Sequence, residues 1–175
     1  MTSSSPNPRR SPMGEFAALV FAVVSVLVFI GFAVWFWVQA PDTVASHFDS
    51  SGQPDDWSSK AGTLGWLVPI GVGLPLLFSS RWIWEKLPSS IINIPFKDYW
   101  LNSGEHTYLY DCLMQFMRIT GGALALLLTS VLVMIMREGR GATMPTGMTF
   151  IPTGVFLIIT AAALINLVRR LSPPR

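Results

Sequence analysis

The chain has 175 residues, of which 51% are hydrophobic and only 13% are charged, and its formal net charge is +2. Because about a quarter of the residues in a soluble domain are usually charged, this composition excludes an ordinary soluble protein. The single cysteine excludes an internal disulfide bond, and we expect no nucleic-acid partner.

The first apolar segment is long enough to cross a membrane. Residues 1–13 are rich in serine, proline and asparagine, so we expect a disordered cytoplasmic tail there. The 23 residues from Phe16 to Val38 then include no ionisable side chain. As a helix they would be about 34 Å long, which exceeds the roughly 30 Å hydrocarbon core of a bilayer. We therefore predict a membrane span at residues 16–38.

Three further apolar segments follow, at residues 64–78, 119–136 and 149–168. The first of them contains Pro69 and Pro75, which remove backbone hydrogen bonds from a helix. We therefore predict a short, bent second span whose freed carbonyl groups are satisfied by neighbouring helices. The lipid bilayer is the expected environment of all four spans.

The sequence thus predicts an all-α integral membrane protein. Its four-helix domain covers residues 14–170, and residues 171–175 form a short basic cytoplasmic tail. The connection at residues 79–105 is apolar enough to lie on the membrane interface. Residues 105–118 have helical spacing and should form an amphipathic helix that runs into the third span. The polar stripe of this helix consists of Asp111, Gln115 and Arg118. We expect this stripe to face solvent, and contact with a partner is the alternative.

The distribution of basic residues predicts the orientation of the chain. With four spans both termini lie on one side, together with nine of the 12 lysines and arginines; the other three, Lys60, Arg137 and Arg140, lie opposite. Because cytoplasmic loops are enriched in basic residues, we predict both termini in the cytoplasm of a bacterium and a multi-pass protein of its plasma membrane. The loop at residues 41–60 then faces outward.

This outer loop contains the most unusual polar stretch, SHFDSSGQPDDWSSK at residues 46–60. A histidine and three aspartates are possible metal ligands, but their spacing does not match a calcium loop and a zinc site requires more nitrogen or sulfur. Turn chemistry explains the composition better: Gly52 reverses the chain, Ser58 or Ser59 caps the next helix, and Lys60 pairs with an aspartate. We therefore assign no metal and no cofactor.

Catalysis by a cysteine–histidine pair is excluded by the predicted topology. His47 lies on the opposite side from His106 and Cys112, and these two are six residues apart, about 240° around a helix. The spans also lack the ionisable groups that a proton- or ion-coupled transporter requires. We expect no catalytic residues and no enzyme activity.

Small residues within the spans indicate close helix packing. Gly121 with Ala125, and Gly154 with Ala161, recur on one helix face and permit close approach of another helix. These contacts are either inside the bundle or between molecules. Membrane-protein partners and a homo-oligomer therefore both stay open.

The order of residues in the outer loop resembles the signature of a bacterial membrane domain of unknown function, found at the N-terminus of Sdp-type toxin immunity proteins. Asp49 stands where that family usually has asparagine. The residues of this signature loop are His47, Phe48, Asp49, Gly52, Pro54, Asp55, Trp57 and Lys60, with Pro41 and Ser59 also matching.

A second stretch, at residues 94–101, is similar to the family's segment after the second span. Phe96 replaces an asparagine, and the proline–glutamate–arginine run that usually follows is missing. The residues of this inner-loop motif are Pro95, Lys97, Asp98, Tyr99 and Trp100.

The resemblance covers the first two spans and the loop after them, and it implies a membrane protein without known enzyme activity or cofactor. In the immunity proteins, the attributed roles are protection against a secreted toxin and signalling to a cytoplasmic repressor. We therefore expect a protein that senses or binds a peptide or lipid through residues 41–60. The alternative is an accessory subunit of a larger membrane complex. Whether the signature loop is structural or binds a ligand stays open.

Overall fold

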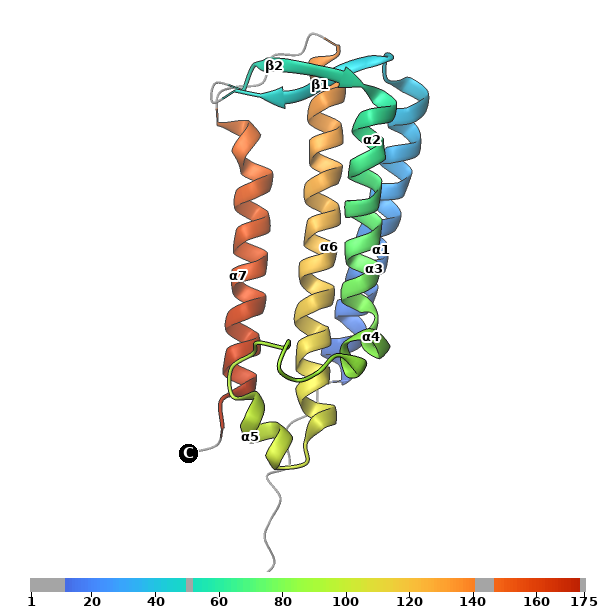
Figure 1. Cartoon of the computed structure of the whole chain (residues 1–175). Helices are drawn as coiled ribbons and strands as arrows, with labels where there is room; N and C mark the ends of the chain where they lie inside the picture. The colour runs from blue at the N-terminus through green and yellow to red at the C-terminus, as the bar shows by residue number, and fades with distance from the viewer. Residues whose placement is uncertain (1–11, 50–51, 141–146, 174–175) are drawn as a thin grey trace, which may run out of the picture.

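The computed structural model describes residues 12–49, 52–140 and 147–173, and most of them are helical (Figure 1). The elements in chain order are α1 (Pro12–Gln39), β1 (Thr43–Phe48), β2 (Pro54–Ser59), α2 (Lys60–Val68), the π-helical turn η1 (Pro69–Gly73), α3 (Leu74–Ser79), α4 (Arg81–Lys86), α5 (Lys97–Asn102), α6 (His106–Glu138), the 3₁₀ turn η2 (Met148–Phe150) and α7 (Ile151–Leu171).

Four helical stretches are long and apolar enough to cross a membrane: Pro12–Gln39, Lys60–Ser79, His106–Glu138 and Ile151–Leu171. This finding confirms the predicted number of spans and indicates a multi-pass membrane protein. The orientation of the chain, with both termini in the cytoplasm, stays a prediction.

The longest helix, α6, lies at the centre of the bundle and packs against α1, α3 and α7. The β1–β2 hairpin lies across one end of the helices, and α4 and α5 lie at the other end (Figure 1). We call these the hairpin end and the α5 end. The main core runs between α1, α2 and α6, where Phe29, Phe36, Leu67 and Leu132 are fully buried.

The prediction of an all-α fold is wrong at residues 43–59. Two antiparallel strands pair there, with Thr43 opposite Ser59, Ala45 opposite Trp57 and Phe48 opposite Pro54. A bulge between Ala45 and Phe48 interrupts the alternation of the strand. Two short strands with a bulge and mostly polar side chains do not produce the regular pattern of a half-buried strand.

Several predicted boundaries also change. The first span begins at Pro12, inside the segment predicted as a disordered tail, and α7 ends at the buried Leu171, the first residue of the predicted C-terminal tail. The rest of that N-terminal tail, residues 1–11, and residues 174–175 lie outside the described part of the chain. The amphipathic segment does run into the third span as predicted, because α6 continues from His106 to Glu138.

The second span is longer than predicted, because the helix starts at Lys60. Its two prolines fall at positions that tolerate them. Pro69 starts the π-helical turn, and Pro75 lies in the first turn of α3. A π-helical turn shifts the hydrogen-bonding register, and so the helix continues although proline has no amide hydrogen to donate.

The two pairs of small residues, which we call the first seam (Gly121 and Ala125) and the second seam (Gly154 and Ala161), lie in different surroundings. At Gly121 an added Cβ would lie 3.0 Å from Cα of Pro75, and Ala125 is fully buried. At Gly154 an added Cβ would meet nothing within 4 Å, and Ala161 is exposed. The first seam therefore packs α6 against α3 within the bundle, whereas the second faces away from it.

We expect Gly121→Ala to destabilise the protein by about 1–3 kcal/mol, because the methyl group would press against the backbone of α3. The matched control is Gly154→Ala, which should be neutral or slightly stabilising since alanine is the better helix former. Thermal unfolding of the detergent-solubilised protein measures both. Equal shifts for the two variants would contradict the assignment of the first seam to the bundle interior.

Candidate functional site

The inward face of the hairpin covers the core at its end of the bundle. Val44 on this face is 3% exposed. Val44 belongs to the same apolar cluster as Phe36 and Leu132, and Phe48 packs against that cluster. Burial of apolar side chains on this face stabilises the hairpin on the helices.

Lys60 connects the end of α1 to the start of α2. Its Nζ lies 3.2 Å from the Asp42 carboxylate, donates to the Ala40 carbonyl oxygen at 3.3 Å, and is 5.5 Å from the centre of the Trp37 ring. A lysine that donates to a carbonyl at a helix C-terminus also interacts favourably with the helix dipole. The ion pair with a loop aspartate, predicted from the sequence, is confirmed.

The two serines before Lys60 fix the start of α2. Ser59 Oγ accepts a hydrogen bond from the Gly62 amide at 3.0 Å, which confirms the predicted N-cap. Ser58 Oγ and Thr63 Oγ1 are 2.8 Å apart, and Thr63 is buried. The junction from hairpin to helix is thereby closed by short-range hydrogen bonds.

The tip of the hairpin is held by Asp49 and Gly52. An Asp49 carboxylate oxygen accepts from the Gln53 amide at 2.9 Å, and the Gly52 amide donates to the Asp49 carbonyl at 3.0 Å. Gly52 has φ +84°, a conformation that glycine adopts readily. An added Cβ there would also lie 3.3 Å from Cγ2 of Thr149 in η2. Hydrogen bonds between Asp49 and residues 52 and 53 thus hold the ends of the two strands together beside the start of α7.

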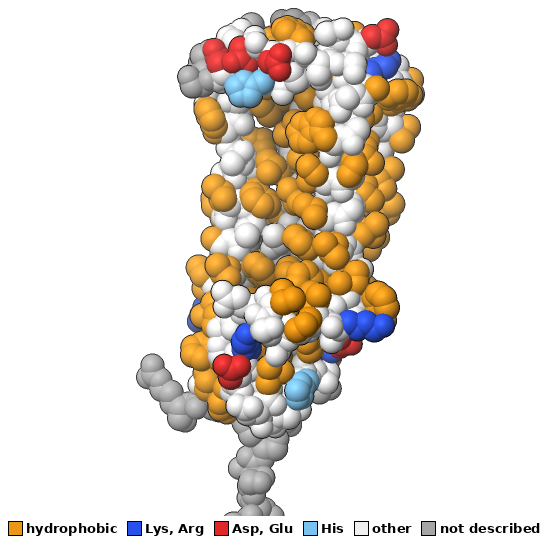
Figure 2. All heavy atoms as spheres, viewed as in Figure 1, with side chains coloured by type: hydrophobic (Ala, Val, Ile, Leu, Met, Phe, Trp, Pro, Cys, Tyr) orange, Lys and Arg blue, Asp and Glu red, His pale blue; other side chains and the backbone are white. Residues whose placement is uncertain are grey.

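A second set of hairpin side chains points away from the bundle. His47 Nδ1 lies 2.5 Å from Oδ1 of Asp55, and these side chains are 67% and 49% exposed. Ser46 Oγ donates to Oδ2 of Asp56 at 3.0 Å, and Trp57 is exposed. Figure 2 shows acidic side chains gathered beside a histidine at the hairpin end. We call His47, Asp55, Asp56 and Trp57 the exposed set.

The contact with Asp55 raises the pKa of His47 above 6.5. The hydrogen bond to Asp55 is the largest cause, and the negative charge of Asp55 is the next; Asp56 and Asp49 add smaller effects. The hydrogen bond and the negative charges all favour the protonated imidazole. At neutral pH this part of the hairpin therefore retains more positive charge than an isolated histidine would supply.

The inner-loop motif closes the other end of the bundle. Lys97 Nζ donates to the carbonyl oxygens of Ser89 and Ile92 at 2.8 and 3.1 Å. Trp100 is buried, and its Nε1 donates to the Leu171 carbonyl at 2.8 Å, while Tyr108 donates to the Arg170 carbonyl at 2.9 Å. Two carbonyl groups at the end of α7 are thus satisfied by side chains. Lys97 and Trp100 hold the fold together.

The remaining motif residues, Pro95, Asp98 and Tyr99, are exposed, and the Tyr99 ring meets the Trp100 ring edge to face. Phe96 between them has φ +60°, which is uncommon for a bulky side chain. Asparagine tolerates this conformation better. The asparagine found here in the resembling family therefore suits the observed backbone.

The structure corrects the expected solvated face on the amphipathic part of α6. Asp111 is only 7% exposed and accepts a hydrogen bond from Arg81, whose Nε also lies 2.6 Å from Glu85. Gln115 accepts from Arg170. The polar stripe therefore contacts α4 and α7 of the same chain. The spacing of Asp111, Gln115 and Arg118 along one helix face was the only sequence signal, and it did not reveal Arg81 as a partner.

No group of three or more histidine, cysteine or acidic side chains within residues 12–49, 52–140 and 147–173 is placed to hold a metal ion. His106 is exposed whereas Cys112 is buried among apolar residues. The structure does not bring these two side chains together.

The fold defines a multi-pass membrane protein in which a β-hairpin joins the first two spans. Residues 24–72 of the chain match the family model of a domain of unknown function, DUF1648. The match extends from the middle of α1 through the hairpin into η1 and so contains the signature loop. No curated protein and no solved structure matches the chain.

We expect a histidine NMR titration of the solubilised protein to give His47 a pKa above 6.5 and Asp55→Asn to lower it. The matched control, Asp42→Asn, should leave it unchanged because Asp42 pairs with Lys60. Since the folded pKa is the higher one, the stabilisation of the hairpin is complete below pH about 6.5 and is lost as the pH rises through the folded pKa. A pKa that is unaltered by Asp55→Asn would refute the pairing.

Proposed function

We propose that this chain is a non-enzymatic membrane receptor of the immunity-protein-like class, which binds a peptide or lipid through the exposed set of its hairpin. The observation that carries the proposal is that two groups of residues at positions 41–60 make different contacts. Val44, Phe48 and Lys60 hold the hairpin on the helices, whereas His47, Asp55 and Asp56 make side-chain hydrogen bonds to other hairpin residues in the described part of the chain. Surface side chains that do not anchor the hairpin to the helices are available to a ligand.

The charge of the hairpin favours a cationic ligand. Four aspartates, Asp42, Asp49, Asp55 and Asp56, oppose Lys60 and a partly protonated His47. Exposed Trp57 adds apolar surface beside these carboxylates. A basic, partly apolar peptide combines the two complementary features. The resemblance of the signature loop to that of Sdp-type immunity proteins supports a secreted toxin peptide as the ligand.

If this function is correct, deletion of the gene should increase the sensitivity of the cells to peptides from the spent medium of their own species. His47→Ala and Asp55→Ala should fail to restore resistance at normal protein abundance, because their pair lies at the surface and does not anchor the hairpin to the helices. Gln53→Ala, at the exposed tip of the same hairpin, is the matched control and should restore it. Growth under peptide challenge and immunoblotting of membranes measure the two quantities.

Gly52→Ala and Lys60→Ala should instead lower the amount of folded protein, since one strains the turn and the other removes the junction with α1. The receptor proposal fails if deletion leaves peptide sensitivity unchanged. A purely structural hairpin would be indicated if His47→Ala and Asp55→Ala reduced abundance as much as these two variants.

A second candidate function, an accessory subunit of a larger membrane complex, is favoured by the surface of α7. Only 11% of the most apolar part of α7 is buried, compared with 50% for α6. The small residues Gly154 and Ala161 lie on this weakly covered helix. A helix of this kind suits packing against another membrane protein or a second copy.

For this candidate, purification from native membranes in mild detergent should retain a partner at fixed stoichiometry. Gly154→Leu should release that partner, because the larger side chain prevents close approach, while Gly65→Leu on α2 serves as the control with equally open surroundings. Quantitative mass spectrometry of the purified material measures the ratio. Recovery of the chain alone, as a monomer, would contradict the subunit role.

A further inference from the structure

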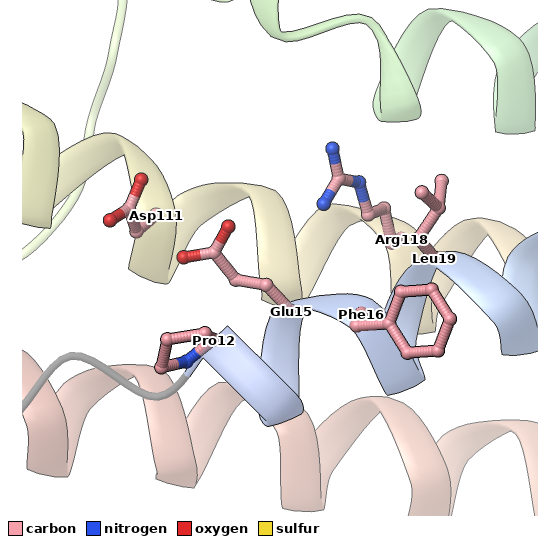
Figure 3. A pocket seen from close by; sticks show the side chains of 6 residues that line it. All are labelled: Pro12, Glu15, Phe16, Leu19, Asp111 and Arg118. Atoms are coloured by element: carbon pink, nitrogen blue, oxygen red, sulfur yellow. The ribbon is translucent and has the colours of Figure 1, made fainter.

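A pocket of about 410 Å³ lies between the first turns of α1 and the beginning of α6 (Figure 3). It is at the α5 end, remote from the hairpin. The residues that line it are Pro12, Glu15, Phe16, Leu19, Asp111 and Arg118. Its size is within the range of small-molecule sites, roughly 300–1,000 Å³.

The pocket lies at the depth of the lipid headgroups. Glu15 immediately precedes the uncharged run that begins at Phe16, and Arg118 immediately precedes the one that begins at Ile119. Both charged side chains therefore mark the level at which the hydrocarbon core starts. Phe16, which is 69% exposed, and Leu19 continue from the pocket along the lipid-facing surface of α1.

Arg118 supplies an unsatisfied donor. Its Nε is buried and has no hydrogen-bond partner in the described part of the chain, and no ion pair there includes Arg118. By contrast, the nearby Arg81 already forms ion pairs with Glu85 and Asp111. A buried guanidinium N–H without an acceptor is costly, and a phosphate is the acceptor that matches its geometry.

Two carboxylates occupy the same pocket. Glu15 and Asp111 lie next to each other and interact through their side chains (Figure 3). Arg81 pairs with Asp111, whereas Glu15 takes part in no ion pair among the described residues and interacts with Arg81 and Arg118 only as nearby charges. Adjacent carboxylates repel each other, so a further cation between them would be stabilised.

The pocket thus combines N–H donors for a phosphate group with a pair of carboxylates, both at the depth of the lipid headgroups. Together they complement a zwitterion. We propose that this pocket binds the headgroup of an amine-bearing phospholipid, with its phosphate on Arg118 and its ammonium on Glu15 and Asp111. An acyl chain would then lie along Phe16 and Leu19. This inference does not depend on the function of the hairpin.

The same chemistry predicts which headgroups bind less well. A primary ammonium carries three N–H donors for the two carboxylates, while the trimethylated ammonium of phosphatidylcholine has none. Phosphatidylglycerol has the phosphate but no ammonium group, so the carboxylates of Glu15 and Asp111 would repel its negative charge. Phosphatidylethanolamine is therefore the expected preference.

The test uses native mass spectrometry of the full-length protein, loaded with equal amounts of phosphatidylethanolamine and its mono-, di- and trimethylated forms with identical acyl chains. Retention by the wild-type protein should fall with each methyl group, by about tenfold over the series. Phosphatidylglycerol should be retained no better than the trimethylated lipid. Equal retention of all the lipids overturns the proposal without any variant.

Variants then locate the site. Arg118→Gln should reduce retention of phosphatidylethanolamine about tenfold, and Glu15→Gln should abolish the preference over the trimethylated lipid. Arg137→Gln, an exposed arginine at the opposite end of α6, is the matched control and should behave as wild type. Arg118→Lys keeps the charge and should retain an intermediate amount of lipid.

Two results would overturn the assignment to this pocket. One is equal lipid retention by Arg118→Gln and Arg137→Gln. The other is unchanged retention by the double variant Glu15→Gln/Arg118→Gln together with reduced thermal stability, because that combination indicates an internal Glu15–Arg118 pair in place of a lipid site.

Discussion

Lipid offers no hydrogen-bond partner to a peptide group, and this constraint determines how the chain distributes its polar residues. The four spans satisfy their backbones internally as helices, and even Pro69 of the second span is accommodated by a π-helical turn. Polar side chains are consequently concentrated at the two ends of the bundle. Both candidate sites, the hairpin and the pocket beside Arg118, are products of this separation.

At each end of the bundle a basic side chain links two helical elements. At the hairpin end Lys60 joins the end of α1 to the start of α2, and at the α5 end Arg81 joins α4 to α6 through Asp111. Each cation links elements that are separated by a change of chain direction. Between them the bundle relies on apolar packing along α6, in which Gly121 allows α3 to approach closely.

Features set by local chemistry were predictable from the sequence. The uncharged run from Phe16 to Val38, the helix cap at Ser59 and the ion pair of Lys60 depend on residues close to one another in the chain. The bond from Trp100 to the Leu171 carbonyl and the burial of Asp111 depend on packing between distant segments, which no local pattern encodes. The hairpin was missed because a bulge interrupts its already weak alternation.

The attachment of α7 to the bundle involves few of its side chains. Trp100 and Tyr108 hold its last turn through main-chain carbonyl groups, which every amino acid provides. Most other positions of α7 face outward. Outward-facing positions of α7 therefore contribute little to its attachment within this chain, which depends on main-chain groups of the last turn and on the buried Ala163, Leu167 and Leu171.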